Sequence, residues 1–278
     1  MAHALASLVF LALAFAVLWL AHRLCADRIA RAGGTPLGEQ ISSLNNTAVA
    51  LRFASFALAS GLGLCGPLMA PSTGFFRDVA GFAFTGAVLL ALLVAAFAML
   101  DKLALPKIDN TRAILGGNLA VGLVEAGGGL ATGLILRAAF TGQGTVFSGV
   151  VFFLLGQLAL MLFLKLLERL SPYDDQDEIA RGNTALGLHL GSMLVCLGII
   201  LASAVLGDFS HWGEDLTAFA LAAVRGVVLL LACSWLADRV FLAGTTLGEE
   251  ITRDRNLAAV IAEAGVKLGI ALIIAATA

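Results

Sequence analysis

The sequence contains few charged residues. Lys and Arg number 17 and Asp and Glu 19 among 278 residues, or 13% of the chain. Soluble domains carry about 25% charged residues and about 45–50% apolar ones, whereas this chain is 60% hydrophobic with a mean hydropathy of +0.97. Too few polar side chains are present to cover a water-soluble globule, so much of the surface must face lipid. The sequence therefore predicts an all-α, polytopic membrane protein.

Several functional classes lack their usual signals. The net charge is −2 with no basic stripe, so no nucleic-acid partner is expected. The four cysteines lie far apart without metal-ligand spacing, and neither a metal nor a cofactor is expected. No nucleophile motif, nucleotide loop or zinc signature is present, so we expect no enzyme. The acidic segment 171–178 fits no calcium-loop spacing and is typical of a solvated linker.

Long apolar runs dominate the chain. Segments of about 20 apolar residues, the length that crosses a bilayer, predict eight spans at residues 4–22, 46–70, 79–100, 114–139, 145–167, 182–206, 215–237 and 256–277. The even-numbered spans are richer in Gly and Ala, and the odd-numbered ones in Leu, Phe and Val. Because small residues permit close helix contact, we expect the even spans inside the bundle and the odd spans against lipid.

The basic residues predict the orientation of these spans. Loops after odd spans hold 12 of the 17 Lys and Arg residues, three in each of four loops, whereas loops after even spans hold two. By the positive-inside rule the four basic loops face the cytoplasm. Both termini are then predicted on the non-cytoplasmic side.

The sequence repeats itself internally. Residues 34–41 read GTPLGEQI and residues 244–251 read GTTLGEEI, identical at six of eight positions. Every even span begins with an Asn-x-Ala triplet, at Asn46, Asn118, Asn183 and Asn256. These signals divide the chain into four helical hairpins, residues 1–72, 73–141, 142–208 and 209–278. Each hairpin has two spans, so all four cross the membrane in parallel. They could close as a pseudo-fourfold ring or form two facing four-helix halves.

Ionisable residues recur inside the even spans at matched depth. Arg52 and His189 follow their Asn by six residues, and Glu125 and Glu263 follow theirs by seven. If the even spans line a centre, these four form one polar layer, with Arg52 neutralising one Glu and His189 serving the other. Lys267 lies four residues after Glu263, on the same helix face. Glu125 has no such partner on its own helix and is the better candidate for a titrating group.

The Asn and Gly residues of the even spans each allow two interpretations. Asn is a favoured helix N-cap, which explains all four residues, but four Asn at one mouth with helix N-termini between them would favour anions. The cluster Gly127, Gly128, Gly129 and Gly133 predicts close helix packing. Because Gly costs about 1 kcal/mol relative to Ala in a helix, a kink or narrow passage there is a second hypothesis.

Tandem hairpins whose loops lead into Asn-x-Ala and a Gly-rich span resemble the domain-of-unknown-function 350 family, the YjfL-like bacterial inner-membrane proteins. Residues 117–120, followed by Gly127 to Gly129 and Gly133, carry the pattern best. The first hairpin departs from it, with Asn45 before the triplet and Ser55 in place of a glycine. The resemblance implies a multi-pass protein of the bacterial inner membrane and, by association, an envelope-stress setting.

Two functions follow as expectations. The first is a pathway for a small solute, cation or proton that uses Glu125 and Glu263. The second is a membrane scaffold whose cytoplasmic loops recruit a peripheral protein. A pathway requires a polar, water-accessible cavity reaching the Glu layer, whereas a scaffold requires tightly packed even spans and ordered loops. Apart from the lipid bilayer, the sequence specifies no partner and leaves the oligomeric state open.

Overall fold

The structure is a computed structural model that describes residues 2–69, 72–241 and 246–277. The described residues form helices without strands, and eight of the helices are long and apolar enough to cross a membrane. The long helices are α1 (Ala2–Arg31), α3 (Thr47–Leu68), α4 (Phe75–Leu103), α6 (Leu119–Ala139), α7 (Val146–Leu170), α9 (Thr184–Val205), α10 (Trp212–Phe241) and α12 (Leu257–Ala276). The predicted all-α membrane fold is confirmed.

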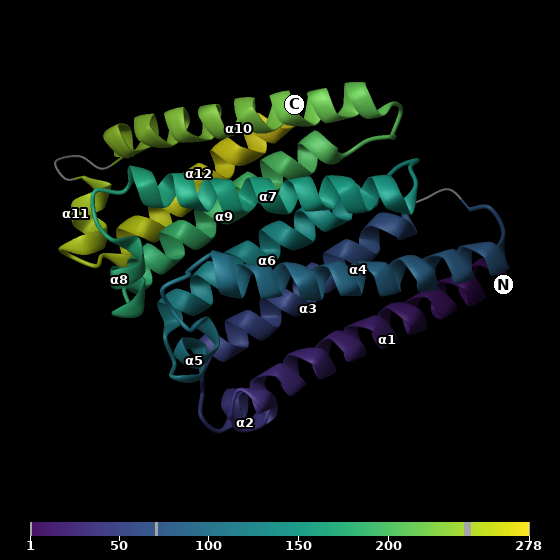
Figure 1. Ribbon diagram of the computed structural model, residues 1–278, viewed down its shortest axis with the longest axis horizontal. Helices are drawn as coiled ribbons and strands as arrows, with labels where there is room; N and C mark the ends of the chain where they lie inside the picture. The colour runs from purple at the N-terminus through teal and green to yellow at the C-terminus, as the bar shows by residue number, and fades with distance from the viewer. Residues whose placement is uncertain (1, 70–71, 242–245, 278) are drawn as a thin grey trace.

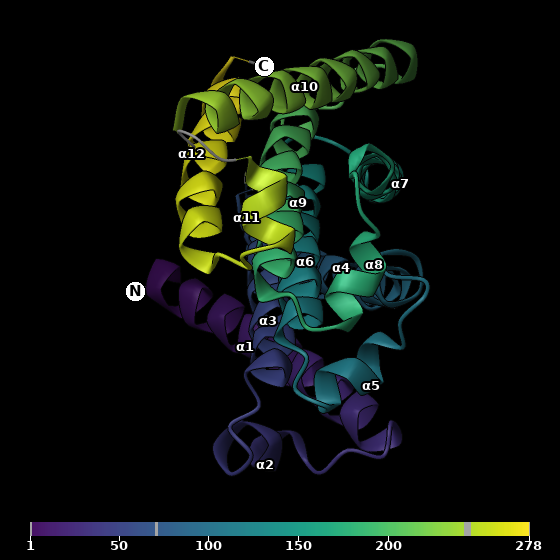
Figure 2. The ribbon, with the colours of Figure 1, turned by 90° about the vertical axis from the view of Figure 1, so that its left-hand side faces the viewer.

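Four six-residue helices, which the sequence analysis missed, connect the long ones. They are α2 (Leu37–Ser42), α5 (Asn110–Leu115), α8 (Asp175–Ala180) and α11 (Leu247–Thr252). All four lie at one end of the molecule, which we call the short-helix end (Figures 1 and 2). Residues 244–245, the first two of the repeated motif at 244–251, lie outside the described residues, and α11 follows them.

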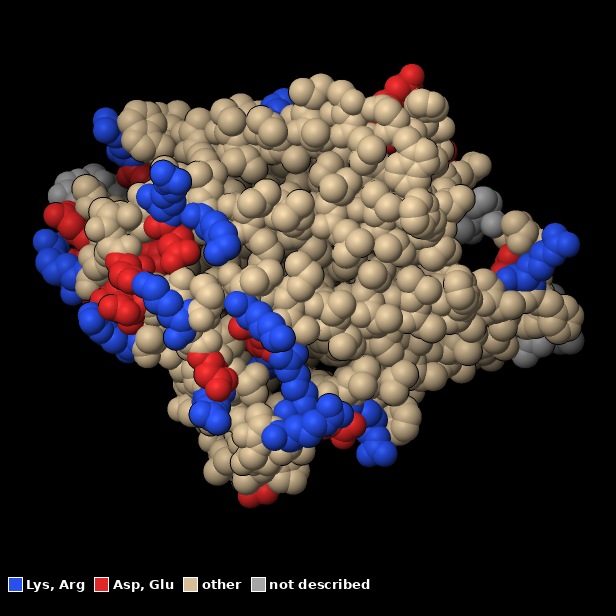
Figure 3. Space-filling model, viewed as in Figure 1, with Lys and Arg blue, Asp and Glu red and all other residues tan. Residues whose placement is uncertain are grey.

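The first helix of each hairpin continues beyond its predicted span. The helices α1, α4, α7 and α10 end at Arg31, Leu103, Leu170 and Phe241, whereas the predicted spans end at 22, 100, 167 and 237. The added residues are partly charged, and Lys, Arg and acidic side chains gather over this end of the molecule (Figure 3). Hydropathy alone ends a span where the lipid ends, but a helix continues as long as its backbone bonds do.

The four helices that begin after Asn stand side by side in an open row, in the order α3, α6, α9, α12 (Figures 1 and 2). The helix α4 packs on α3 and α6, α7 packs on α6 and α9, and α10 packs on α9 and α12. The helix α1 packs on α3 and α4. This row is neither of the two arrangements expected from the repeats, a ring or two facing halves.

Small residues allow the row to pack closely. A Cβ added at Gly127 of α6 would lie 2.2 Å from the carbonyl oxygen of Gly191 on α9, and one at Gly133 would lie 2.5 Å from the Cα of Ala59 on α3. The backbones therefore touch on both sides of α6. The helix α6 continues without interruption through residues 127–129.

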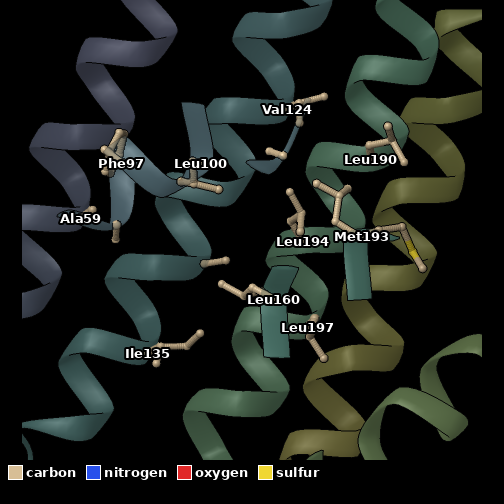
Figure 4. Packing of buried hydrophobic residues seen from close by; sticks show 14 of the residues in the cluster. Ala59, Phe97, Leu100, Val124, Ile135, Leu160, Leu190, Met193, Leu194 and Leu197 are labelled. Atoms are coloured by element: carbon tan, nitrogen blue, oxygen red, sulfur yellow. The ribbon is translucent and has the colours of Figure 1, made fainter. Parts of the chain in front are cut away.

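Larger side chains fill the remaining space around α6 and α9. Gly128 and Gly129 of α6 leave room for Leu100 and Phe97 of α4. Figure 4 shows this packing beside a second group of apolar side chains around α9, labelled Leu190, Met193, Leu194 and Leu197. Burial is greatest in α6 and α9, whereas α1, α10 and α12 are largely exposed. The expectation of buried even spans therefore holds for the middle of the row and fails for α12 at its edge.

Candidate functional site

Each of the four Asn residues caps the helix that follows it. Their side-chain oxygens accept hydrogen bonds from the backbone N–H groups of Val49, Val121, Leu186, and both Ala258 and Ala259. The predicted N-caps are confirmed. Because the helices form a row, the four caps lie along a line at the short-helix end and do not surround a common mouth.

The side-chain nitrogens of the first three Asn residues reach the next hairpin. Asn46 donates to the carbonyl oxygen of Ile114 at 3.1 Å, and Asn118 donates to that of Ile179 at 2.9 Å. Asn183 donates to the carbonyl oxygen of Ile251 at 2.9 Å. Each Asn thus caps one helix and bonds the C-terminal turn of the short helix in the following hairpin.

A first charged cluster joins four of the long helices. Arg52 of α3 lies between two carboxylates, with its Nε 3.1 Å from Oε2 of Glu125 on α6 and its Nη2 paired with Asp101 on α4. Arg28 of α1 also pairs with Asp101, and Thr111 accepts a hydrogen bond from Arg52 at 3.1 Å. Arg52 and Glu125 are 4% and 2% exposed. Two permanent cations face two carboxylates, so the charges balance.

A second charged cluster occupies the equivalent place in the other half of the chain. Nδ1 of His189 on α9 lies 3.0 Å from Oε1 of Glu263 on α12, and Lys267 pairs with the same carboxylate. The Lys267 Nζ is also 3.5 Å from Oδ1 of Asp238 on α10. These two carboxylates face one permanent cation. The cluster carries one excess negative charge while His189 is neutral, and a proton on the imidazole balances it.

Asp175 adds a further carboxyl group beside the second cluster. It is the first residue of α8, is 2% exposed, and accepts a hydrogen bond from Ser171 at 3.0 Å. Burial raises the pKa of Asp175 to about 6, against the lowering effects of the Ser171 hydrogen bond and the charge of His189. The expectation that residues 171–178 form a solvated linker is therefore wrong for Asp175, because its side chain is buried.

The single polar layer expected across the bundle is not formed. Arg52 pairs with Glu125 and His189 with Glu263, but the two pairs belong to separate clusters. At the α6–α9 junction between the two clusters, the sixth residue after the Asn of α6 is Val124 and the seventh after the Asn of α9 is Leu190. Both are buried (Figure 4). A ring would bring all four ionisable residues to one axis, whereas a row distributes them along its length. Glu125, which has no charged partner on its own helix, pairs with Arg52 of the neighbouring helix.

Two acidic partners, Asp101 and Asp238, were missed in the sequence analysis. Both belong to an acid-base pair that recurs near the end of the first helix of every hairpin, at Asp27-Arg28, Asp101-Lys102, Glu168-Arg169 and Asp238-Arg239. This recurrence is the signal that could have identified them. It lies just beyond the apolar runs, where a search for charges inside the spans does not reach.

A cavity of about 1070 Å³ opens at the end of the molecule opposite the short helices. Its lining includes Phe152 of α7 and the charged residues Arg77, Asp78, Asp208 and Asp215. It does not reach either charged cluster, whose residues are absent from the lining. Within the described ranges, no group of His, Cys, Asp and Glu has the arrangement of a metal site.

Comparison with known proteins points to one family. The family described as Domain of Unknown Function (DUF350) matches residues 1–140 and 142–278. The chain is similar to a UPF0719 transmembrane protein of Aquifex aeolicus (strain VF5), with 26% identity over 174 residues. That match covers 61% of this chain and 63% of the relative, less than two thirds of the relative's length. No solved structure matches.

Proposed function

This chain belongs to the DUF350 family, and we propose that it is a membrane protein of the bacterial inner membrane that exchanges protons at the second charged cluster. Proton uptake by His189 accompanies the passage of a cation or small solute. The observation that carries this proposal is the charge count: Glu263 and Asp238 face one permanent cation, Lys267, and the remaining partner is a histidine. Histidine is the side chain whose ordinary pKa permits charging between pH 5 and 8.

The two clusters differ in which of their groups are exposed. In the first cluster Arg28 is 39% exposed and Glu125 is 1% exposed, whereas in the second the His189 and Asp238 side chains are 14% and 26% exposed. Charged groups at membrane depth are retained where they pair or meet a water-filled space. A partly exposed histidine in a cluster with one missing positive charge is suited to exchange a proton with the short-helix side, which the positive-inside rule favours as the cytoplasmic side.

The groups that face His189 come from three elements. Glu263 and Lys267 lie on α12, Asp238 on α10, and Asp175 on α8. Three are acids and one is a base. Protonation would strengthen the α9–α12 contact, because it converts the His189–Glu263 hydrogen bond into an ion pair.

A non-transporting scaffold is the second candidate. It is favoured by the close backbone contact between Gly127 of α6 and Gly191 of α9, and by a cavity whose lining does not include the charged clusters. The four ordered short helices would offer the surface for a peripheral protein.

Proton flux into liposomes tests the choice. We expect the purified protein, reconstituted with a pH dye inside and driven by a potassium diffusion potential, to admit protons. His189→Gln should lose this flux, because Gln keeps a polar side chain without a charge. His211→Gln, at an exposed histidine on the opposite end, is the matched control and should keep it. Unchanged flux in His189→Gln removes the second cluster from the mechanism, and wild-type protein without any proton flux favours the scaffold.

A further inference from the structure

We infer that a second copy of this chain binds along the exposed edge of α12, with its α3 continuing the row. Contacts inside the row indicate this arrangement. They repeat in one register at the α3–α6 and α6–α9 junctions: the fourth residue after Asn118 or Asn183 packs on the second residue after the preceding Asn, and the fifteenth packs on the thirteenth. Added Cβ atoms would lie 2.5–3.0 Å from the Cα atoms beneath them, at Gly122 on Ala48, Gly187 on Ala120, Gly133 on Ala59 and Gly198 on Ala131.

Both open edges of the row carry small residues at these positions. On α12, the second and thirteenth residues after Asn256 are Ala258 and Gly269, and both are exposed. On the outer face of α3, the fourth and fifteenth residues after Asn46 are Ala50 and Gly61. A Cβ added at Gly61 or Gly269 would meet no atom of the described residues within 4 Å. The α12 edge therefore presents small residues at the second and thirteenth positions, as a preceding helix of the row does. The α3 edge presents them at the fourth and fifteenth positions, as a following helix does.

The hydrogen bonds of the Asn residues stop at the same edge. The first three Asn side chains each donate to an Ile carbonyl in the next hairpin. Asn256 donates to Glu250 of its own hairpin at 2.8 Å, and the described part of the chain offers it no following short helix. The equivalent carbonyl at the start of the chain belongs to Ile41 of α2, and no Asn side chain of the described residues reaches it. In the proposed arrangement, the Asn256 side chain of one copy would donate to the Ile41 carbonyl oxygen of the next copy.

Junctions with an ion pair alternate along the row with a junction that has none, and this pattern is compatible with a second copy. Ion pairs cross from α3 to α6 and from α9 to α12, whereas the α6–α9 junction has Val124 opposite Leu190. At the proposed junction the same two positions are Ala262 of α12 and Phe53 of α3. No unpaired charge would be buried there. The junction repeats the apolar class already present at the middle of the row.

The two edges differ, so the contact is head to tail and not a two-fold one. The helix α1 is consistent with this, because α4, α7 and α10 each pack on two helices of the row whereas α1 packs on α3 alone. A neighbouring α12 beside α3 would supply the second support for α1. The proposal concerns assembly and does not depend on proton exchange at the second cluster.

Directed disulfide formation in membranes tests the register. In a background with all four native cysteines replaced by Ala, one tagged copy carries Ala50→Cys and a differently tagged copy carries Ala258→Cys. We expect a disulfide between the two tags when they are co-expressed and oxidised, because these positions would face each other within bonding range. Neither variant expressed alone should cross-link to itself. The control pair, Leu158→Cys on α7 with Val224→Cys on α10, lies at two exposed positions and should not cross-link.

Three outcomes would overturn the proposal: absence of the product in membranes that contain both folded copies, a disulfide between two Ala258→Cys copies, or cross-linking only to a different protein. A second variant addresses the same edge. Gly269→Trp has open space in the single chain, so it should fold but lose association in single-molecule counting of subunits in bilayers. Val228→Trp on lipid-facing α10 should not change the count. Equal subunit numbers in Gly269→Trp and wild type would also overturn it.

Discussion

The two charged clusters are built on the same helix positions and differ in one cation. Arg52 and His189 each follow their Asn by six residues, and each approaches a Glu that follows the next Asn along the row by seven. The first cluster has Arg28 and Arg52 against two acids, whereas the second has Lys267 alone as a permanent cation. An arginine is charged at every physiological pH and a histidine is not. If the second cluster exchanges protons as proposed, the comparison separates a structural ion pair from a proton-exchanging one within a single chain.

Removing the central cation should affect the first cluster more. We expect Arg52→Gln to lower the free energy of unfolding by about 3–5 kcal/mol, because Glu125 and Asp101 are left with one cation between them. His189→Gln should cost only about 1 kcal/mol, the typical value of one hydrogen bond, because Lys267 still pairs with Glu263. Unfolding of both variants in mixed detergent micelles measures the difference.

The double variant Arg52→Gln with Glu125→Gln serves as the control for this comparison. It removes the unpaired carboxylate along with the cation and should recover part of the lost stability. Equal losses in Arg52→Gln and His189→Gln would mean that the two clusters are energetically alike, and the distinction between a structural and an exchanging pair would be wrong.

Exchanging the two cations should exchange the pH response. Arg52→His should make stability depend on pH, with the variant more stable at pH 5.5 than at pH 8, because the imidazole pairs as a cation only when protonated. His189→Arg should remove the corresponding dependence from the second cluster and add stability at pH 8. Thermal unfolding of each variant at the two pH values tests this. If the stability of Arg52→His is the same at both pH values, the first cluster does not need a second cation for its stability.

The sequence predicted the membrane class, the eight long helices and the four caps because each depends on local pattern. Apolar runs report lipid exposure, and an Asn before a helix reports its own capping bond. It also placed Arg52, His189, Glu125 and Glu263 at matched depth and gave each basic residue one Glu, without deciding which Glu each would pair with. These are properties of one helix or of two neighbouring repeats.

The arrangement of the repeats could not be predicted in this way. Whether four hairpins form a ring or a row depends on which two faces of each helix carry small residues. Gly187 and Gly191 meet α6, whereas Ala258 and Gly269 of α12 meet no described helix. The sequence shows small residues in both cases. Asp101 and Asp238 were missed because they lie past the apolar runs, where a charge has an ordinary explanation as a solvated helix end.

A further difference between the surroundings of His189 and those of Arg52 is Asp175. In α5 the first residue is the neutral Asn110, whereas in α8 it is Asp175, whose pKa burial raises from 3.8 to about 6. A carboxyl with a raised pKa weakens the fold as it ionises, so the cost begins above about pH 4 and is complete above about pH 6. We expect Asp175→Asn to raise stability at pH 8 by about 1–3 kcal/mol and to have little effect at pH 4. Thermal unfolding at both pH values, with the exposed Asp177→Asn as control, measures it. A gain that is equal at the two pH values would show that the Asp175 charge is not its cause.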